Sequence, residues 1–189
     1  ENLNQAFNAS TSVAADTYNI TNLETNGLSI SAGNPAVANG LLANDLEDDA
    51  FTNLTNAPVD VIYTVVPVSG SNCEGEPFNV TVTVNPEPVV ANQTTTVCSD
   101  ETLGFTLAND LNGPDVASYN LTNITANGLT AASGNTSLQN GLLVDAISND
   151  SWNNISATAL DVVYTFVPLG DNGCLGDPFT VTVTVNPEP

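Results

Sequence analysis

The chain has 189 residues, 41% of them hydrophobic, and it carries 21 acidic residues but no lysine, arginine or histidine. Nucleic acids and anionic membrane surfaces are not expected partners, because both are bound through Lys or Arg, and no apolar run is long enough for membrane insertion. Ser-His and Cys-His nucleophiles and lysine Schiff bases are excluded as well, so only carboxylate chemistry remains for an enzyme.

An internal repeat divides the chain into two parts. Tyr18–Pro88 aligns without a gap on Tyr119–Pro189, at an offset of 101 residues. A period of this length, with short strands and no helical pattern, is typical of tandem β-sandwich domains. We therefore predict an all-β chain with two domains, residues 1–88 and 89–189, each a β-sandwich of about seven strands with almost no helix.

The predicted strands follow the same order in both repeats. Thr17–Leu23 and Ser118–Ile124 are strands, and the Asn-Gly pair that follows each is a tight turn into a short strand. A second Asn-Gly pair leads into another short strand, and a longer loop comes next. The matching ranges are Leu28–Ala32 and Leu129–Ala132 for the first short strand, Ala36–Ala43 and Ser137–Val144 for the second, and Leu46–Asn56 and Ile147–Ala157 for the loop.

Each repeat ends in a long hairpin, Val59–Pro88 and Leu160–Pro189. The second strand of each hairpin alternates valine with threonine, which is the period of a half-buried strand. Its loop contains Cys-x-Gly-acid-Pro, and the hairpin closes with Asn-Pro-Glu-Pro. Two prolines in four residues favour a semi-rigid junction, so the repeats are expected to follow one another end to end.

The first repeat has no counterpart of Val89–Asp100, because the chain begins close to the equivalent of Glu101. In the second repeat this segment supplies the first strand. We therefore expect the first strand of the first repeat to lie upstream of Glu1, and an exposed sheet edge where it is missing. A strand from the same long chain or from a neighbouring chain would fill that edge.

Three cysteines give an odd count. Cys73 and Cys174 occupy the same position in the two hairpins, and Cys98 lies in the first strand of the second repeat. Pairing early and late cysteines within one repeat predicts a Cys98–Cys174 disulfide, worth about 4 kcal/mol by the chain-entropy model. Cys73 is then unpaired in this chain, with its partner upstream. The alternative is three buried thiols.

Asp45, Glu47, Asp48 and Asp49 form the densest acidic cluster. Carboxylate and amide oxygens are the ligands that calcium prefers, so calcium is a candidate here, although no cofactor is required. The spacing differs from the EF-hand pattern, and the second repeat has fewer carboxylates in the corresponding loop. A hydrated acidic loop is the favoured interpretation.

Phe51 and Trp152 occupy the same position in the long loops of the two repeats. An aromatic residue there either anchors the loop to the core or stacks on a bound ligand. The core anchor is the favoured interpretation, and ligand contact by the two aromatics is the alternative.

The hairpin motif resembles a known family. Tyr164–Pro168, Gly173–Pro178 and Phe179–Pro187, with the matching set in Tyr63–Pro86, resemble the PKD-like, immunoglobulin-like repeats of very large Bacteroidetes surface proteins. These include the SprB-type gliding-motility adhesins, which are exported by the type IX secretion system. The resemblance implies immunoglobulin-like sandwiches, an extracellular location at the cell surface, and no catalytic residues.

Two hypotheses for function follow. The favoured one is a structural or adhesive segment of a long extracellular surface protein or filament, whose partners are neighbouring repeats and other copies of the chain. The alternative is a module that binds a surface glycan or protein. An enzyme is not predicted, because the acidic positions vary between the two copies and no elaborated loops shape a substrate cleft.

Overall fold

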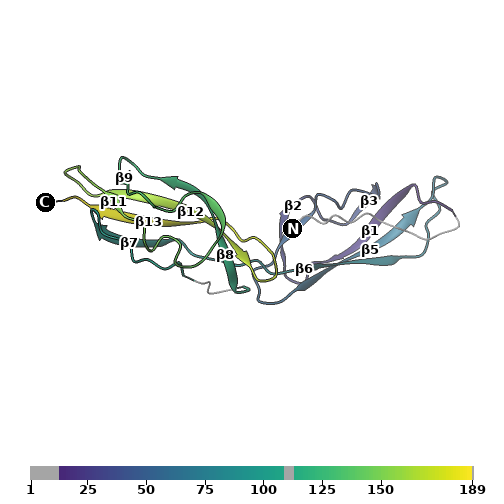
Figure 1. Ribbon diagram of the computed structural model, residues 1–189. Helices are drawn as coiled ribbons and strands as arrows, with labels where there is room; N and C mark the ends of the chain where they lie inside the picture. The colour runs from purple at the N-terminus through teal and green to yellow at the C-terminus, as the bar shows by residue number, and fades with distance from the viewer. Residues whose placement is uncertain (1–12, 109–112, 189) are drawn as a thin grey trace. The chain divides into compact units, whose positions relative to one another are not determined.

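The computed structural model describes residues 13–108 and 113–188 (Figure 1). These residues contain strands β1 to β13 and no helix, and thus none that could span a membrane. The chain divides into two compact units, Glu1–Pro86 and Glu87–Pro189. The division lies two residues before the predicted domain boundary at residue 88, because Glu87 and Pro88 belong to the second unit.

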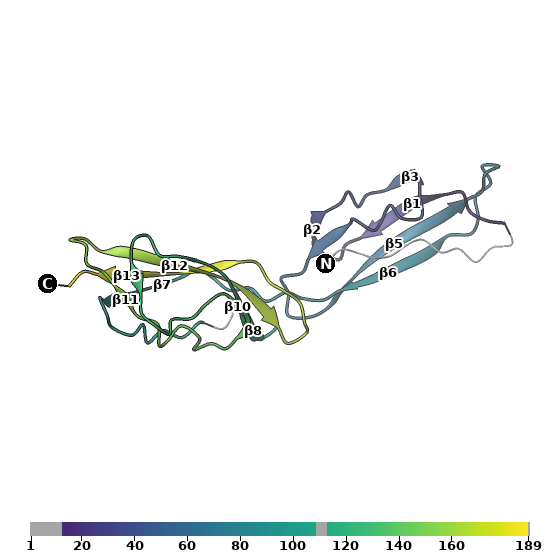
Figure 2. The same cartoon turned by 45° about the horizontal axis from the view of Figure 1, so that its top comes forward.

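The first unit has one larger sheet and one pair of short strands. The larger sheet has the order β3-β1-β5-β6, and β5 and β6 form its long hairpin (Figure 2). The short strands β2 and β4 pair with each other. The strands are β1 (Thr17–Glu24), β2 (Ser29–Ala32), β3 (Ala38–Leu41), β4 (Ala50–Thr52), β5 (Val59–Val68) and β6 (Phe78–Val84).

The second unit repeats this arrangement and adds one strand. Its larger sheet has the order β10-β8-β12-β13-β7, and β9 pairs with β11. The added strand β7 lies parallel to β13. The strands are β7 (Gln93–Cys98), β8 (Val116–Thr125), β9 (Thr130–Ala131), β10 (Gln139–Leu142), β11 (Trp152–Asn153), β12 (Leu160–Gly170) and β13 (Phe179–Asn186).

Both cores form because alternate residues of the central strands point inward. Along β12, Val162, Tyr164 and Phe166 have no exposed surface. The rings of Phe166 and Phe179, from the two arms of the hairpin, stack with their centroids 5.7 Å apart. Equivalent positions fill the first core, namely Ile20, Leu46, Phe51, Val61, Tyr63 and Val65. The predicted all-β fold of two tandem β-sandwiches is confirmed.

The two units differ at the outer side of the last strand. In the second unit β7 flanks β13, and Phe179, Val181 and Val183 are buried. In the first unit β6 has no strand on its outer side among the described residues, and Phe78 and Val80 are only half-buried. Among the described residues, the first repeat thus has no counterpart of β7.

Candidate functional site

The acidic cluster of the first unit does not converge on a metal position. Asp45, Glu47 and Asp48 are exposed, whereas Asp49 is buried, at 2% exposure. Asp45 Oδ2 accepts a hydrogen bond from the Leu42 N–H at 2.9 Å and so closes the turn that follows β3. Among the described residues, no three acidic or cysteine side chains are placed to hold a metal ion. The calcium candidate, which the sequence pattern ranks below a hydrated acidic loop, therefore gains no support from the placement of these residues.

Asp49 instead takes part in a buried polar contact. The Tyr63 hydroxyl donates to Asp49 Oδ2 at 2.9 Å, and the Asn34 N–H donates to Oδ1 at 3.2 Å. Gly33 has φ +75°, and a Cβ on it would lie 2.5 Å from Asp49 Oδ1, so the close approach requires glycine. Burial raises the pKa of Asp49. The two hydrogen-bond donors lower this pKa in part, and the neighbouring Asp48 carboxylate raises it.

The second unit has the same tyrosine–aspartate contact with two additional donors, the Trp152 indole N–H and the Thr136 hydroxyl. The Tyr164 hydroxyl donates to Asp150 Oδ2 at 2.8 Å and accepts from Trp152 Nε1 at 2.7 Å. Thr136 replaces the proline found at this position in the first unit, and both its N–H and its hydroxyl donate to Asp150 Oδ1. Burial and the Asp150 carboxylate raise the pKa of Tyr164. These carboxylates therefore fasten the long loop to the central strand.

Phe51 and Trp152 are core residues. Phe51 is 2% exposed and Trp152 is 4% exposed, and each belongs to the hydrophobic core of its own unit. Side chains this buried cannot stack on a ligand from solution, so the alternative role as ligand-contact aromatics is wrong. They anchor the long loop.

Sequence reasoning missed the structural role of Asn53 and Asn154. Both are 1% exposed. Asn154 Nδ2 donates to the Thr158 and Val185 carbonyls at 3.0 and 2.7 Å, and its Oδ1 accepts from the N–H and hydroxyl of Ser156. Asn53 makes the same four bonds in the first unit, including one to the Val84 carbonyl at 2.8 Å. The repeated Asn-x-Ser/Thr after the aromatic residue is the signal that could have identified them.

The predicted Cys98–Cys174 disulfide is wrong. Cys98 pairs with Asn186 at the end of β13, whereas Cys174 lies in the loop before β13 begins. A strand rises about 3.3 Å per residue, so the length of β13 separates them by roughly 20 Å, far beyond disulfide reach. Neither residue is in a disulfide in the structure, and nor is Cys73, which is exposed. Repeat spacing could not reveal that the parallel pairing of β7 places its cysteine at the far end.

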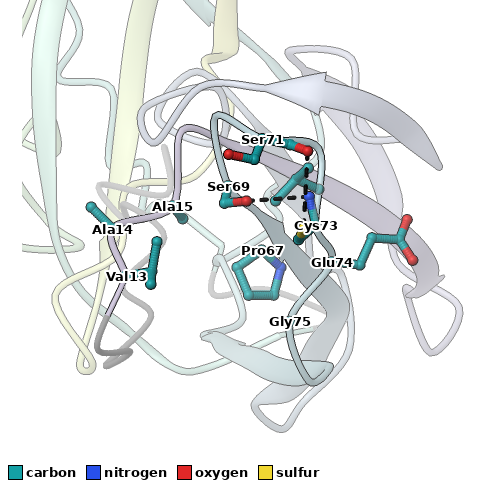
Figure 3. A pocket seen from close by; sticks show the side chains of 10 residues that line it. Val13, Ala14, Ala15, Pro67, Ser69, Ser71, Cys73, Glu74 and Gly75 are labelled. Carbon is teal, nitrogen blue, oxygen red and sulfur yellow. Dashed lines mark hydrogen bonds between the residues drawn. The ribbon is translucent and has the colours of Figure 1, made fainter.

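A groove lies at the end of the β5–β6 hairpin of the first unit (Figure 3). We call it the hairpin groove. Residues 13–15, which precede β1, line one side, and Pro67, Ser69, Cys73 and Gly75 line the other, around a volume of about 340 Å³. The loop is held by the Ser69 N–H, which donates to the Cys73 carbonyl at 3.0 Å, and by the Gly75 N–H, which donates to the Pro67 carbonyl at 2.8 Å.

In the second unit, Glu87 and Pro88 occupy the corresponding groove. Pro88 is buried, and a Cβ on Gly176 would coincide with its carbonyl oxygen. A Cβ on Gly170 would lie 3.4 Å from Pro88 Cδ and 3.2 Å from Pro114 Cγ. Burial, and then the Asp177 carboxylate, raise the pKa of Glu87. The residues that open the second unit are therefore part of its packing.

A family model described as PKD-like domain matches residues 36–88 and 95–189. The chain belongs to this family. Both matched segments contain a complete β-hairpin with its Cys-x-Gly-acid-Pro loop, and a PKD-like domain is a module typical of extracellular and surface proteins and usually non-catalytic. No curated protein matches the chain.

The buried aspartate of the first PKD-like unit gives a pH-dependent prediction. Because the pKa of Asp49 is raised in the folded unit, ionisation costs folding free energy as pH rises from the unfolded value, about 3.9, through the folded value. Asn cannot ionise. We expect the melting temperature of Asp49→Asn to increase relative to that of the wild type as the pH rises from about 3.5 to about 7. The other carboxylates are common to both proteins, so a difference that stays constant with pH would contradict this assignment.

Proposed function

We propose that this chain is a structural repeat segment of a long extracellular surface protein or filament, serving as a stalk or spacer that supports adhesion or gliding. The observation that carries the proposal is the use of the same polar and aromatic positions in both units. Asp49 and Asp150, Asn53 and Asn154, and Phe51 and Trp152 are all buried and close their own sandwich. The polar and aromatic side chains that could have contacted a ligand are thus buried in the two units, where they stabilise two similar sandwiches.

The junction supports the same proposal. Pro86 ends the first unit and Glu87 begins the second, with no flexible segment rich in glycine or serine between them. The lack of lysine and arginine also removes every cleavage site for trypsin-like proteases, which suits a protein exposed outside the cell. The resemblance to gliding adhesin repeats belongs to this proposal.

Single-molecule stretching of the whole chain, attached at its two ends, tests the load-bearing part of the proposal. We expect two unfolding events, each releasing one unit, because the two cores are separate. Unfolding at forces too low to resolve would argue against a load-bearing role.

Antibodies against the chain should label intact cells that produce the protein; labelling only after permeabilisation would contradict a surface location.

A binding module for glycan or protein is the second candidate, and one observation favours it. A hollow of about 480 Å³ in the first unit is lined by Asn34, Asn44 and the exposed carboxylates of the acidic cluster. Its polar lining could accept hydrogen bonds from sugar hydroxyls. A glycan array decides between the candidates, because saturable binding that Asn44→Ala abolishes would favour the module, and no binding would favour the spacer.

A further inference from the structure

Each unit carries an Asn-Gly pair on an edge strand of its larger sheet. The strands β3 and β10 are these edge strands, and they contain Asn39–Gly40 and Asn140–Gly141 (Figure 2). Glycine has no side chain to hinder attack of its backbone nitrogen on the preceding asparagine, so such a pair is prone to deamidation. All four residues are exposed, and a Cβ on either glycine would meet no atom beyond its chain neighbours within 4 Å. The room that the reaction needs is therefore present.

In each edge strand, one side chain of the neighbouring strand holds the glycine nitrogen. The Gly40 N–H donates to Asn19 Oδ1 at 3.0 Å, and the Gly141 N–H donates to Asn120 Oδ1 at 3.1 Å. Both acceptors lie where the pairing of the edge strand shifts register. Because the proton on the Gly40 nitrogen points at Asn19, that nitrogen cannot attack Asn39 until the hydrogen bond opens.

The asparagine side chains of the two edge pairs are not held in the same way. Among the described residues, the amide groups of Asn39 and Asn140 make no hydrogen bond. In the other described Asn-Gly pairs, the asparagine side chain is bonded to the backbone of another residue. These bonds are Asn26 Nδ2 to the Asp60 carbonyl at 2.8 Å, Asn127 Nδ2 to the Asp161 carbonyl at 2.9 Å, and the Cys174 N–H to Asn172 Oδ1 at 3.0 Å. At the edge pairs, by contrast, the restraint is the bond on the glycine nitrogen.

We propose that Asn39 and Asn140 are latent deamidation sites, which Asn19 and Asn120 keep unreacted by binding the attacking nitrogen. When the bond opens, the Gly40 nitrogen gives up its proton and bonds to Asn39 Cγ, while the side-chain NH2 group takes up a proton and leaves as ammonia. Water then opens the resulting succinimide at either carbonyl, which gives aspartate or isoaspartate. Either product adds a carboxylate to a chain that has 21 acidic residues and no lysine, arginine or histidine to pair with it. Conversion therefore weakens the pairing of the edge strand and cannot be offset by an ion pair within the chain's own side chains.

Peptide mass spectrometry of the whole chain, after storage in warm and mildly alkaline buffer, tests the proposal. Asn120→Ala removes the acceptor, and conversion of Asn140 should become about tenfold faster, which is the factor that one hydrogen bond of ordinary strength supplies. Asn39 in the same molecules keeps its acceptor and should react at the wild-type rate. Asn19→Ala should reverse the pattern, with Asn39 accelerated and Asn140 unchanged.

Two further measurements separate loss of this bond from a general loosening of the second unit. Asn120→Asp keeps an acceptor oxygen for the Gly141 N–H, so Asn140 should convert as slowly as in the wild type. Asn127 lies in the same unit, and in Asn120→Ala it should also convert at the wild-type rate, because its own bond to the Asp161 carbonyl is untouched. Equal acceleration of Asn127 and Asn140 would indicate unfolding and would overturn the proposal. So would a rate at Asn140 that Asn120→Ala leaves unchanged.

Discussion

Replacing Asn154 with alanine will lower the free energy of unfolding of the second unit by about 3 kcal/mol, which corresponds to about 15 °C in melting temperature for a domain of this size. The side chain is 1% exposed and joins the long loop to the last core strand through the Val185 carbonyl at 2.7 Å. Its removal deletes four hydrogen bonds, including the one that the buried Val185 carbonyl accepts, whereas the exposed Thr158 carbonyl still accepts from the Ser156 hydroxyl. A loss of this size is expected because leaving a buried polar group without a partner costs more folding free energy than a hydrogen bond contributes net.

The chain provides its own matched control and its own probe. Asn53→Ala deletes the equivalent bonds in the first unit. The single tryptophan, Trp152, is buried in the second unit beside Tyr164, so its fluorescence reports unfolding of that unit alone. Asn154→Ala should lower the midpoint temperature of the fluorescence transition. Asn53→Ala should leave that midpoint unchanged and should lower the midpoint temperature of the first unit's transition, which circular dichroism detects. Equal effects of both variants on the fluorescence would show that the units do not unfold separately.

The parts of the fold that the sequence could predict are those set by local pattern. Valine and threonine alternate along β13, and its odd-numbered valines are buried as that period requires. The Asn-Gly pairs at 26–27 and 127–128 both have positive φ, as the predicted tight turns need. The offset of 101 residues carried these assignments from one unit to the other.

The features that the sequence could not predict depend on contacts between distant segments. The run from Asp45 to Asp49 looks like one acidic patch, yet Asp49 turns inward because Tyr63, 14 residues later, offers it a donor in the core. The count of cysteines suggested a disulfide, but only the parallel register of β7 shows that Cys98 and Cys174 lie at opposite ends. Pattern reports which side of a strand is buried, and tertiary pairing decides what meets there.

Supplying the first unit with its own copy of β7 should raise its stability by about 3 kcal/mol. The change places a copy of Val89–Glu101 before Glu1, which keeps the 101-residue register of the repeat. In the second unit this segment flanks β13, and Phe179 and Val181 are 1% and 0% exposed. Their counterparts Phe78 and Val80 are only half-buried, so covering them should remove apolar surface from water.

The measurement is again the thermal transition of the first unit, with Trp152 fluorescence as the internal reference for the second. Changing Thr94 and Thr96 of the added copy to proline is the control, because proline cannot donate to the ladder, and it should abolish the gain. Changing its copy of Cys98 to serine should leave the gain intact, since that cysteine lies a strand length away from the hairpin cysteine. A first transition that does not move would show that the outer side of β6 needs no further strand. If the serine change abolished the gain in stability, the result would support a disulfide between the added cysteine and the hairpin cysteine, which the register of β7 argues against.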